Sequence, residues 1–125
     1  MKPAPFQYQS PQTVDEALVL LDQHGYDAKL IAGGQTLGPL LNMRMASPEV
    51  LIDINRIQAL SYQRHQDDGG LLLGALTRQS TLEDDVRLAE SLPLIAAVEP
   101  DVALRAIRNR GTVAGSLAHA DPAAE

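Results

Sequence analysis

Two glycine-bearing turns constrain this chain more than any other feature of its sequence. The first, Ala32-Gly33-Gly34-Gln35-Thr36, directly follows the apolar stretch 28–31, which is typical of a short buried strand. The second is Gly111-Thr112-Val113-Ala114-Gly115-Ser116. Because glycine has no Cβ, the backbone of each turn can bring its N–H groups close to an anion. Two such turns in one domain predict a clamp on a ligand with two phosphates, and a dinucleotide is the first candidate.

Spacing alone also permits a purely structural interpretation of both turns. A glycine pair serves many tight strand-to-helix connections and is weak evidence for phosphate binding. No Gly-Lys-Ser/Thr follows Gly34, so the turn is not a P-loop, and the pattern G-x-G-x-x-G is absent. The structural alternative for 112–116 is a strand followed by a turn. The small residues in 117–125 favour close packing of this segment against an extended ligand.

The first 55 residues alternate between strand patterns and helix patterns. The expected elements are a strand at 6–9, a helix from Val14 toward Gly25, a strand at 28–32, a helix from Gly38-Pro39 and a strand at 50–54. Thr13 is the expected N-cap of the first helix, and Glu16 completes a capping box. The sequence therefore predicts a β-α-β-α-β unit over 1–55, with a boundary near 55–60.

The second part, 56–125, changes pattern. A hairpin is expected around the turn 66–70, and helical segments are expected at 81–90, 92–98 and 103–107. Asp121 and Pro122 have the pattern of an N-cap and a first helical residue, yet the sequence ends about one turn later. This ending predicts a fragment of a longer polypeptide.

Charge and composition exclude several classes of function. The net charge of −6 argues against a nucleic-acid partner, and no run of about 18 apolar residues predicts a membrane span. The chain has no cysteine, so it offers no thiolate to an iron–sulfur cluster or a zinc ion. The three histidines lack metal-ligand spacing: His24, His65 and His119. These features predict a cytoplasmic protein that binds a cofactor and carries neither a metal site nor a catalytic side chain of its own.

Four segments together resemble one known family. The segments 28–37, 51–54, 73–77 and 107–125 are similar, in the same order, to the FAD-binding medium subunit of molybdenum hydroxylases, the carbon monoxide dehydrogenase and xanthine dehydrogenase family. The resemblance implies an α+β fold, a two-subdomain FAD-binding domain of the p-cresol methylhydroxylase type. Subdomain 1 would be 1–55, and 56–125 would be the first part of subdomain 2, with the C-terminal part missing.

The resemblance also implies which residues contact FAD. The first FAD loop would comprise Lys29, Leu30, Ile31, Ala32, Gly33, Gly34, Gln35, Thr36 and Leu37, with Gly33 to Thr36 on the pyrophosphate. The second would comprise Thr112, Val113, Ala114, Gly115 and Ser116. Asp121 would shape the second loop, and Glu125 would contact the cofactor. Ala114 stands where the family usually has glycine, and its methyl group is tolerated if φ is negative.

The implied function is electron transfer. FAD would accept electrons from 2Fe-2S clusters on a small partner subunit, which receive them from a molybdopterin site on a large subunit, and would pass them to an external acceptor. The implied assembly is a dimer of heterotrimers. Two alternatives stay open at this point: a flavin-free subunit that only assembles the complex, and a stand-alone flavin oxidase.

Overall fold

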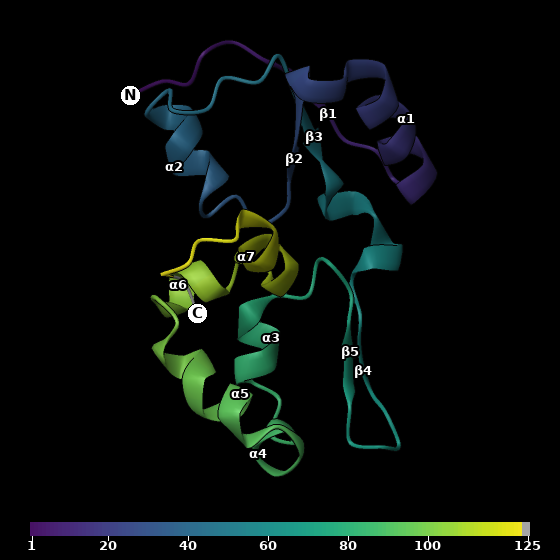
Figure 1. Cartoon of the computed structure of the whole chain (residues 1–125), viewed down its shortest axis with the longest axis vertical. Coiled ribbons are helices and arrows are strands. Elements are labelled where there is room, and N and C mark those ends of the chain that lie inside the picture. Colours follow the sequence, from purple (N-terminus) through teal and green to yellow (C-terminus); the bar gives the residue numbers. More distant parts are fainter. Residues whose placement is uncertain (124–125) are drawn as a thin grey trace. The chain divides into compact units, whose positions relative to one another are not determined.

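The computed structural model describes residues 1–123 of the chain and divides it into two compact units. The first unit is Met1–Ala59 and the second is Leu60–Glu125. Each unit has its own set of helices and strands, drawn in purple to teal and in teal to yellow in Figure 1.

The first unit is built on a parallel three-stranded sheet flanked by helices (Figure 1). Its elements are β1 Gln7–Gln9, α1 Val14–His24, the 3-10 turn η1 Gly25–Asp27, β2 Ala28–Ile31, α2 Leu37–Asn42, β3 Val50–Asp53 and the 3-10 turn η2 Ile54–Arg56. A further 3-10 turn, η3 Gln58–Leu60, crosses the boundary between the units. The strand order is β1-β3-β2, and both pairings are parallel. The order of elements is the β-α-β-α-β order that the sequence predicts.

The central strand β3 forms the core of the first unit. Val50, Leu51 and Ile52 are 3%, 4% and 0% exposed. A parallel strand between two neighbours is covered on both faces, which explains its unbroken run of apolar residues. Ala28 of β2 joins this core, and Leu20 of α1 is among the side chains that pack against it.

Local sequence explains both ends of α1. The Thr13 hydroxyl accepts a hydrogen bond from Glu16 N at 3.1 Å, which confirms the predicted cap. The Glu16 carboxylate accepts from Gln12 N at 2.8 Å, one residue earlier than a capping box requires. Gly25 ends the helix with a φ of 51°, and its N–H donates to Leu21 O.

The second unit combines a hairpin with a series of short helices. Its elements are β4 Gln63–His65, β5 Leu71–Leu73, α3 Gln79–Glu83, α4 Leu88–Ser91, α5 Pro93–Val98, the 3-10 turn η4 Glu99–Asp101, α6 Arg105–Arg108 and α7 Val113–His119. β4 and β5 pair antiparallel, as predicted. Leu76, Leu82 and Leu88 are the most buried apolar side chains of this unit, each at most 3% exposed.

Two predictions for the second unit are wrong. The single helix expected at 81–90 is interrupted between Glu83 and Leu88. Asp85 causes the interruption, because its carboxylate accepts from Arg87 N at 3.1 Å and bonds His65 Nε2 of the hairpin at 2.7 Å. The structural alternative for 112–116, a strand followed by a turn, is also wrong, because Thr112 caps α7 and the next residues form its first turn.

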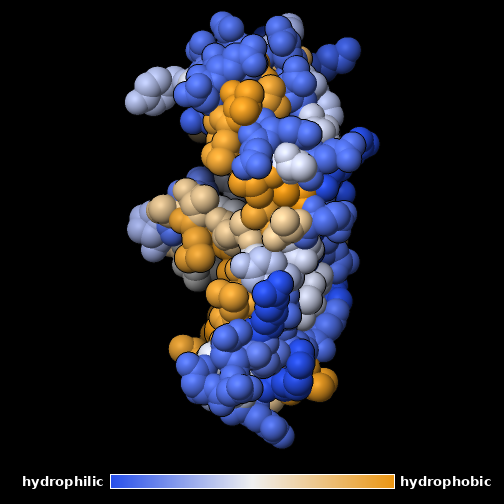
Figure 2. All heavy atoms as spheres, turned by 90° about the vertical axis from the view of Figure 1, so that its right-hand side faces the viewer, coloured by the Kyte–Doolittle hydropathy of each residue, from blue (hydrophilic) through white to orange (hydrophobic). Residues whose placement is uncertain are grey.

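Polar and apolar side chains are mixed on the surface of the first unit, which is the upper part of Figure 2. The exposed apolar residues of α1 are Val14, Leu18 and Val19. Within residues 1–123, no helix is long and apolar enough to cross a membrane.

Candidate cofactor site

The first loop, residues 32–36, connects the end of β2 to the start of α2. Gly34 has a φ of 71°, a conformation that glycine adopts without strain. A Cβ at this position would lie 3.1 Å from Ile31 Cδ1. Gly38 N donates to Gly34 O at 2.8 Å and closes the turn into α2. Lys29, Leu30 and Ile31 lie in β2 and Leu37 begins α2, so the loop itself is shorter than the predicted segment.

The backbone amides of the first loop have no hydrogen-bond acceptor among residues 1–123. In the part of the chain that the structure describes, the N–H groups of Gly33, Gly34, Gln35 and Thr36 donate no hydrogen bond. Consecutive amides around a left-handed glycine form a concave anion-binding surface. The Gln35 side chain bonds to Gly33 O at 3.0 Å and leaves these amides untouched. This loop therefore has the donor set that a phosphate requires.

Two polar side chains at the carboxyl end of β3, joined by Tyr8 of β1, support the first loop. Asn55 Nδ2 donates to Ala32 O at 2.8 Å and to Asp53 Oδ1 at 2.6 Å. Asn55 N donates to the same Asp53 oxygen at 2.9 Å, and the Tyr8 hydroxyl donates to Asp53 Oδ2. Burial raises the pKa of Asp53, but the hydrogen bonds from Tyr8 and Asn55 outweigh it and hold that pKa below its usual range. The sequence reasoning missed Asp53 and Asn55, although polar residues at the carboxyl end of a parallel strand are a recognised sign of a ligand site.

The second loop, residues 111–116, is held against the segment that leads into α3. Gln79 N donates to Gly111 O and Val113 N donates to Thr77 O, both at 3.1 Å. Thr112, which is 3% exposed, accepts from Gly115 N through its hydroxyl at 3.1 Å. A Cβ at Gly115 would lie 2.6 Å from that hydroxyl oxygen, so the cap requires a residue without a side chain there.

Most amides of the second loop are already used inside the protein. The N–H groups of Val113, Gly115 and Ser116 donate to Thr77 O, to the Thr112 hydroxyl and to Thr112 O. Those of Thr112 and Ala114 donate to nothing among residues 1–123. The second loop thus presents fewer donors than the first.

Ala114 fits its position without backbone strain. It lies in the first turn of α7, and among the described residues the non-glycine residues with positive φ are Arg44, Ala103 and Ala120. Its φ is therefore negative, the condition under which the methyl group is tolerated. Alanine in place of the glycine that the resemblance implies therefore adds no backbone strain to α7.

The other predicted contact residues lie near the C-terminus. Asp121 Oδ1 accepts from Ala123 N at 2.9 Å and so fixes the turn after α7. Glu125 lies outside the described residues. The structure thus places 29–37 together in the first unit, and 112–116 with Asp121 in the second. Among residues 1–123, no group of three or more His, Cys, Asp or Glu side chains could hold a metal ion.

Comparison with known proteins settles the family. Residues 4–125 match the family described as the FAD binding domain in molybdopterin dehydrogenase. The chain belongs to this family. The resemblance read from the loop sequences is confirmed, and FAD is the cofactor of the family.

The relatives are subunits of oxidoreductase complexes. The chain is 48% identical over its whole length to the 6-hydroxypseudooxynicotine dehydrogenase complex subunit alpha of Paenarthrobacter nicotinovorans, of which it covers 42%. It is 43% identical, over 98% of its length, to the carbon monoxide dehydrogenase medium chain of Hydrogenophaga pseudoflava, of which it also covers 42%. The chain therefore spans less than half the length of these relatives.

Solved structures confirm the α+β fold. All of this chain superimposes on 43% of a chain of carbon monoxide dehydrogenase from Hydrogenophaga pseudoflava, with a TM-score of 0.94 and 42% identity. It superimposes equally completely on 43% of a chain of quinoline 2-oxidoreductase from Pseudomonas putida 86, with a TM-score of 0.92 and 39% identity.

Proposed function

We propose that this chain is the FAD-binding part of an electron-transfer subunit in a molybdenum hydroxylase. The subunit passes electrons from the iron–sulfur clusters of a partner subunit, through FAD, to an external acceptor. The observation that carries this proposal is the row of four unbonded amides in the first loop, in a chain of the FAD-binding family. FAD, when bound, supplies the redox chemistry, and the protein supplies binding and orientation.

The first loop has the hydrogen-bond donors and the open backbone that binding of a pyrophosphate group requires. The amides of 33–36 donate hydrogen bonds to phosphate oxygens, and the exposed Thr36 hydroxyl adds a further donor. Gly34 lets the phosphate approach closely, because a side chain there would be strained and would crowd Ile31.

In the second loop, Thr112 fixes the first turn of α7, and the amides of Thr112 and Ala114 remain for the cofactor. Asp121 shapes the chain that follows α7.

The proposed partners are a small subunit with 2Fe-2S clusters and a large subunit with molybdopterin, in a cytoplasmic dimer of heterotrimers. Two observations support this assignment. Relatives carry names such as "medium chain" and "complex subunit alpha". These 125 residues contain no cysteine, so the clusters that deliver electrons must be bound elsewhere.

The decisive experiment uses the complete polypeptide that contains this chain, purified with and without its neighbouring subunits. We expect flavin absorption bands that bleach when the complex receives its reducing substrate, and no turnover by the isolated subunit. A colourless protein that cannot be reconstituted with FAD would contradict the proposal in favour of a flavin-free assembly subunit. Turnover without partner subunits would instead support a stand-alone flavin oxidase.

A further inference from the structure

A chain of hydrogen bonds runs from β1 through the end of β3 to the start of the first loop. It starts at the Tyr8 hydroxyl on β1, passes through the two carboxylate oxygens of Asp53 at the end of β3, and reaches Asn55. Asn55 Nδ2 then donates to Ala32 O at 2.8 Å, just after β2. Ala32 is the residue before the glycine pair, so the chain ends where the loop begins.

From this geometry we infer that Asn55 is a positioning residue for the phosphate-binding amides of the first loop. The inference rests on the proposed function and concerns the same site. Asn55 acts through the Ala32 carbonyl and needs no contact of its own with FAD.

The glycine pair creates the need for such a residue. Gly33 and Gly34 have little conformational preference of their own, so the direction of their amides must be set from outside. Gly38 N holds the far end of the loop through Gly34 O at 2.8 Å. Asn55 holds the near end through Ala32 O, and the unbonded amides of 33–36 lie between or beside these two fixed points.

Asparagine can donate to both Ala32 O and Asp53, whereas aspartate and serine cannot. Its amide nitrogen carries two hydrogens, and both are used, one toward Ala32 O and one toward Asp53 Oδ1. An aspartate here could donate neither, and it would place a second carboxylate beside Asp53 and a carbonyl oxygen. Serine would be too short to reach both acceptors.

The test compares Asn55→Asp with Asn42→Asp in the complete subunit, with FAD as the titrated ligand. Asn42 lies in the same unit, is exposed, and gives the same change of charge away from the loop. We expect the FAD dissociation constant to rise about tenfold or more for Asn55→Asp and to change less than about twofold for Asn42→Asp. Asn55→Ser removes the amide without adding a charge and gives the same comparison if Asn55→Asp does not fold.

A swapped double variant separates positioning from general stability. In Asp53→Asn with Asn55→Asp, an amide and a carboxylate again face each other, but nothing donates to Ala32 O. We expect the apoprotein to regain part of the unfolding midpoint that Asn55→Asp loses, while FAD affinity stays low. Recovery of FAD affinity in the swap, or normal affinity in Asn55→Asp, would overturn the inference. A wild-type subunit that binds no FAD would overturn the proposed function instead.

Discussion

The guanidinium of Arg108 contacts both carboxylate oxygens of Glu83, with 2.8 Å from Nε to Oε2 and 2.9 Å from Nη2 to Oε1. The same guanidinium donates to Val102 O at 2.7 Å and to Ala103 O at 3.1 Å. These bonds join α3 to α6 directly before the segment that leads to Thr112. The hydrogen bond from Arg108 also holds the pKa of Glu83 below its usual range.

Replacement of Arg108 should therefore destabilise the second unit far more than replacement of its neighbour Arg105. The Arg108 side chain is 7% exposed, whereas Arg105, which pairs with Asp84 and also with Glu83, is 45% exposed. Exposed ion pairs contribute little. Loss of Arg108 instead leaves the carbonyl oxygens of Val102 and Ala103 without their donor, while Arg105 still compensates the charge of Glu83. We expect Arg108→Ala to lower the thermal midpoint several times more than Arg105→Ala. Equal shifts of the two midpoints in differential scanning fluorimetry would contradict this assignment.

Gly34 and Gly69 offer a matched pair for testing the first loop. Both have positive φ, 71° and 85°, so alanine at either position costs about 1 kcal/mol of backbone strain. A Cβ at Gly69 meets nothing within 4 Å, whereas at Gly34 it lies 3.1 Å from Ile31 Cδ1. We expect Gly34→Ala to abolish or strongly weaken FAD binding and Gly69→Ala to leave it unchanged, as measured by flavin fluorescence titration. Similar FAD retention in the two variants would show that the first loop is not part of the FAD site.

Local patterns explain why parts of this fold could be predicted from the sequence. A few neighbouring residues determine each of three features: the cap at Thr13, the end of α1 at Gly25 and the apolar run of β3. The helix break at Asp85 could not be predicted in this way. It depends on His65, 20 residues away, which bonds the Asp85 carboxylate from the hairpin. Helical periodicity carries no information about such a contact.

The candidate site shows the same division between local and distant information. The glycine pair of the first loop could be found from the sequence, because its residue types are unusual. The second motif was expected to be a turn, since its small residues hide the helical pattern that starts at Val113. Asn55 was missed because its role depends on Ala32, 23 residues away. Only the paired strands β2 and β3 bring these two residues together.

The cap at Thr112 can be tested with two substitutions of similar size. Thr112→Val keeps the shape but leaves Gly115 N without its acceptor, and Thr112→Ser keeps the hydroxyl. We expect Thr112→Val to lower the free energy of unfolding by about 1 kcal/mol and to weaken FAD binding, with smaller effects for Thr112→Ser. Urea denaturation and FAD titration measure the two quantities. Matching losses in Thr112→Ser would show that the methyl group, and not the cap, is what matters.

The hydrogen bond between Tyr8 and Asp53 should give the first unit a characteristic dependence on pH. The bond to Asp53, with a smaller contribution from burial, raises the pKa of Tyr8 above its usual 10.0. A raised tyrosine pKa stabilises the fold fully below pH 10.0, and this contribution is lost as the pH rises through the folded-state value. The lowered pKa of Asp53 has the corresponding effect at acidic pH. Its contribution is present above the usual 3.8 and is lost as the pH falls through the folded-state value.

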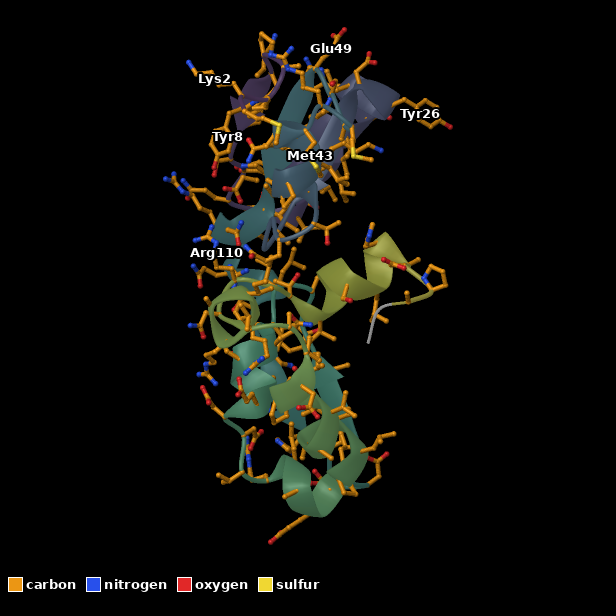
Figure 3. The ribbon with its side chains drawn as sticks, turned by 90° about the vertical axis from the view of Figure 1, so that its left-hand side faces the viewer. Lys2, Tyr8, Tyr26, Met43, Glu49 and Arg110 are labelled. Carbon is orange, nitrogen blue, oxygen red and sulfur yellow. The ribbon has the colours of Figure 1, made fainter. Side chains whose placement is uncertain are left out.

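Tyr8→Phe should therefore destabilise the protein at pH values between the folded-state pKa of Asp53 and that of Tyr8. Outside this pH range it should have no effect. Tyr8 is 56% exposed, so solvent screening reduces the expected loss to about 0.5 kcal/mol. Tyr26→Phe is the matched control, because Tyr26 is fully exposed and lies on the opposite side of the first unit from Tyr8 (Figure 3). The measurement is the difference in unfolding free energy between wild type and each variant at intervals of pH. A difference for Tyr8→Phe that stays constant into strong acid, where Asp53 is protonated, would show that the carboxylate is not the partner that matters.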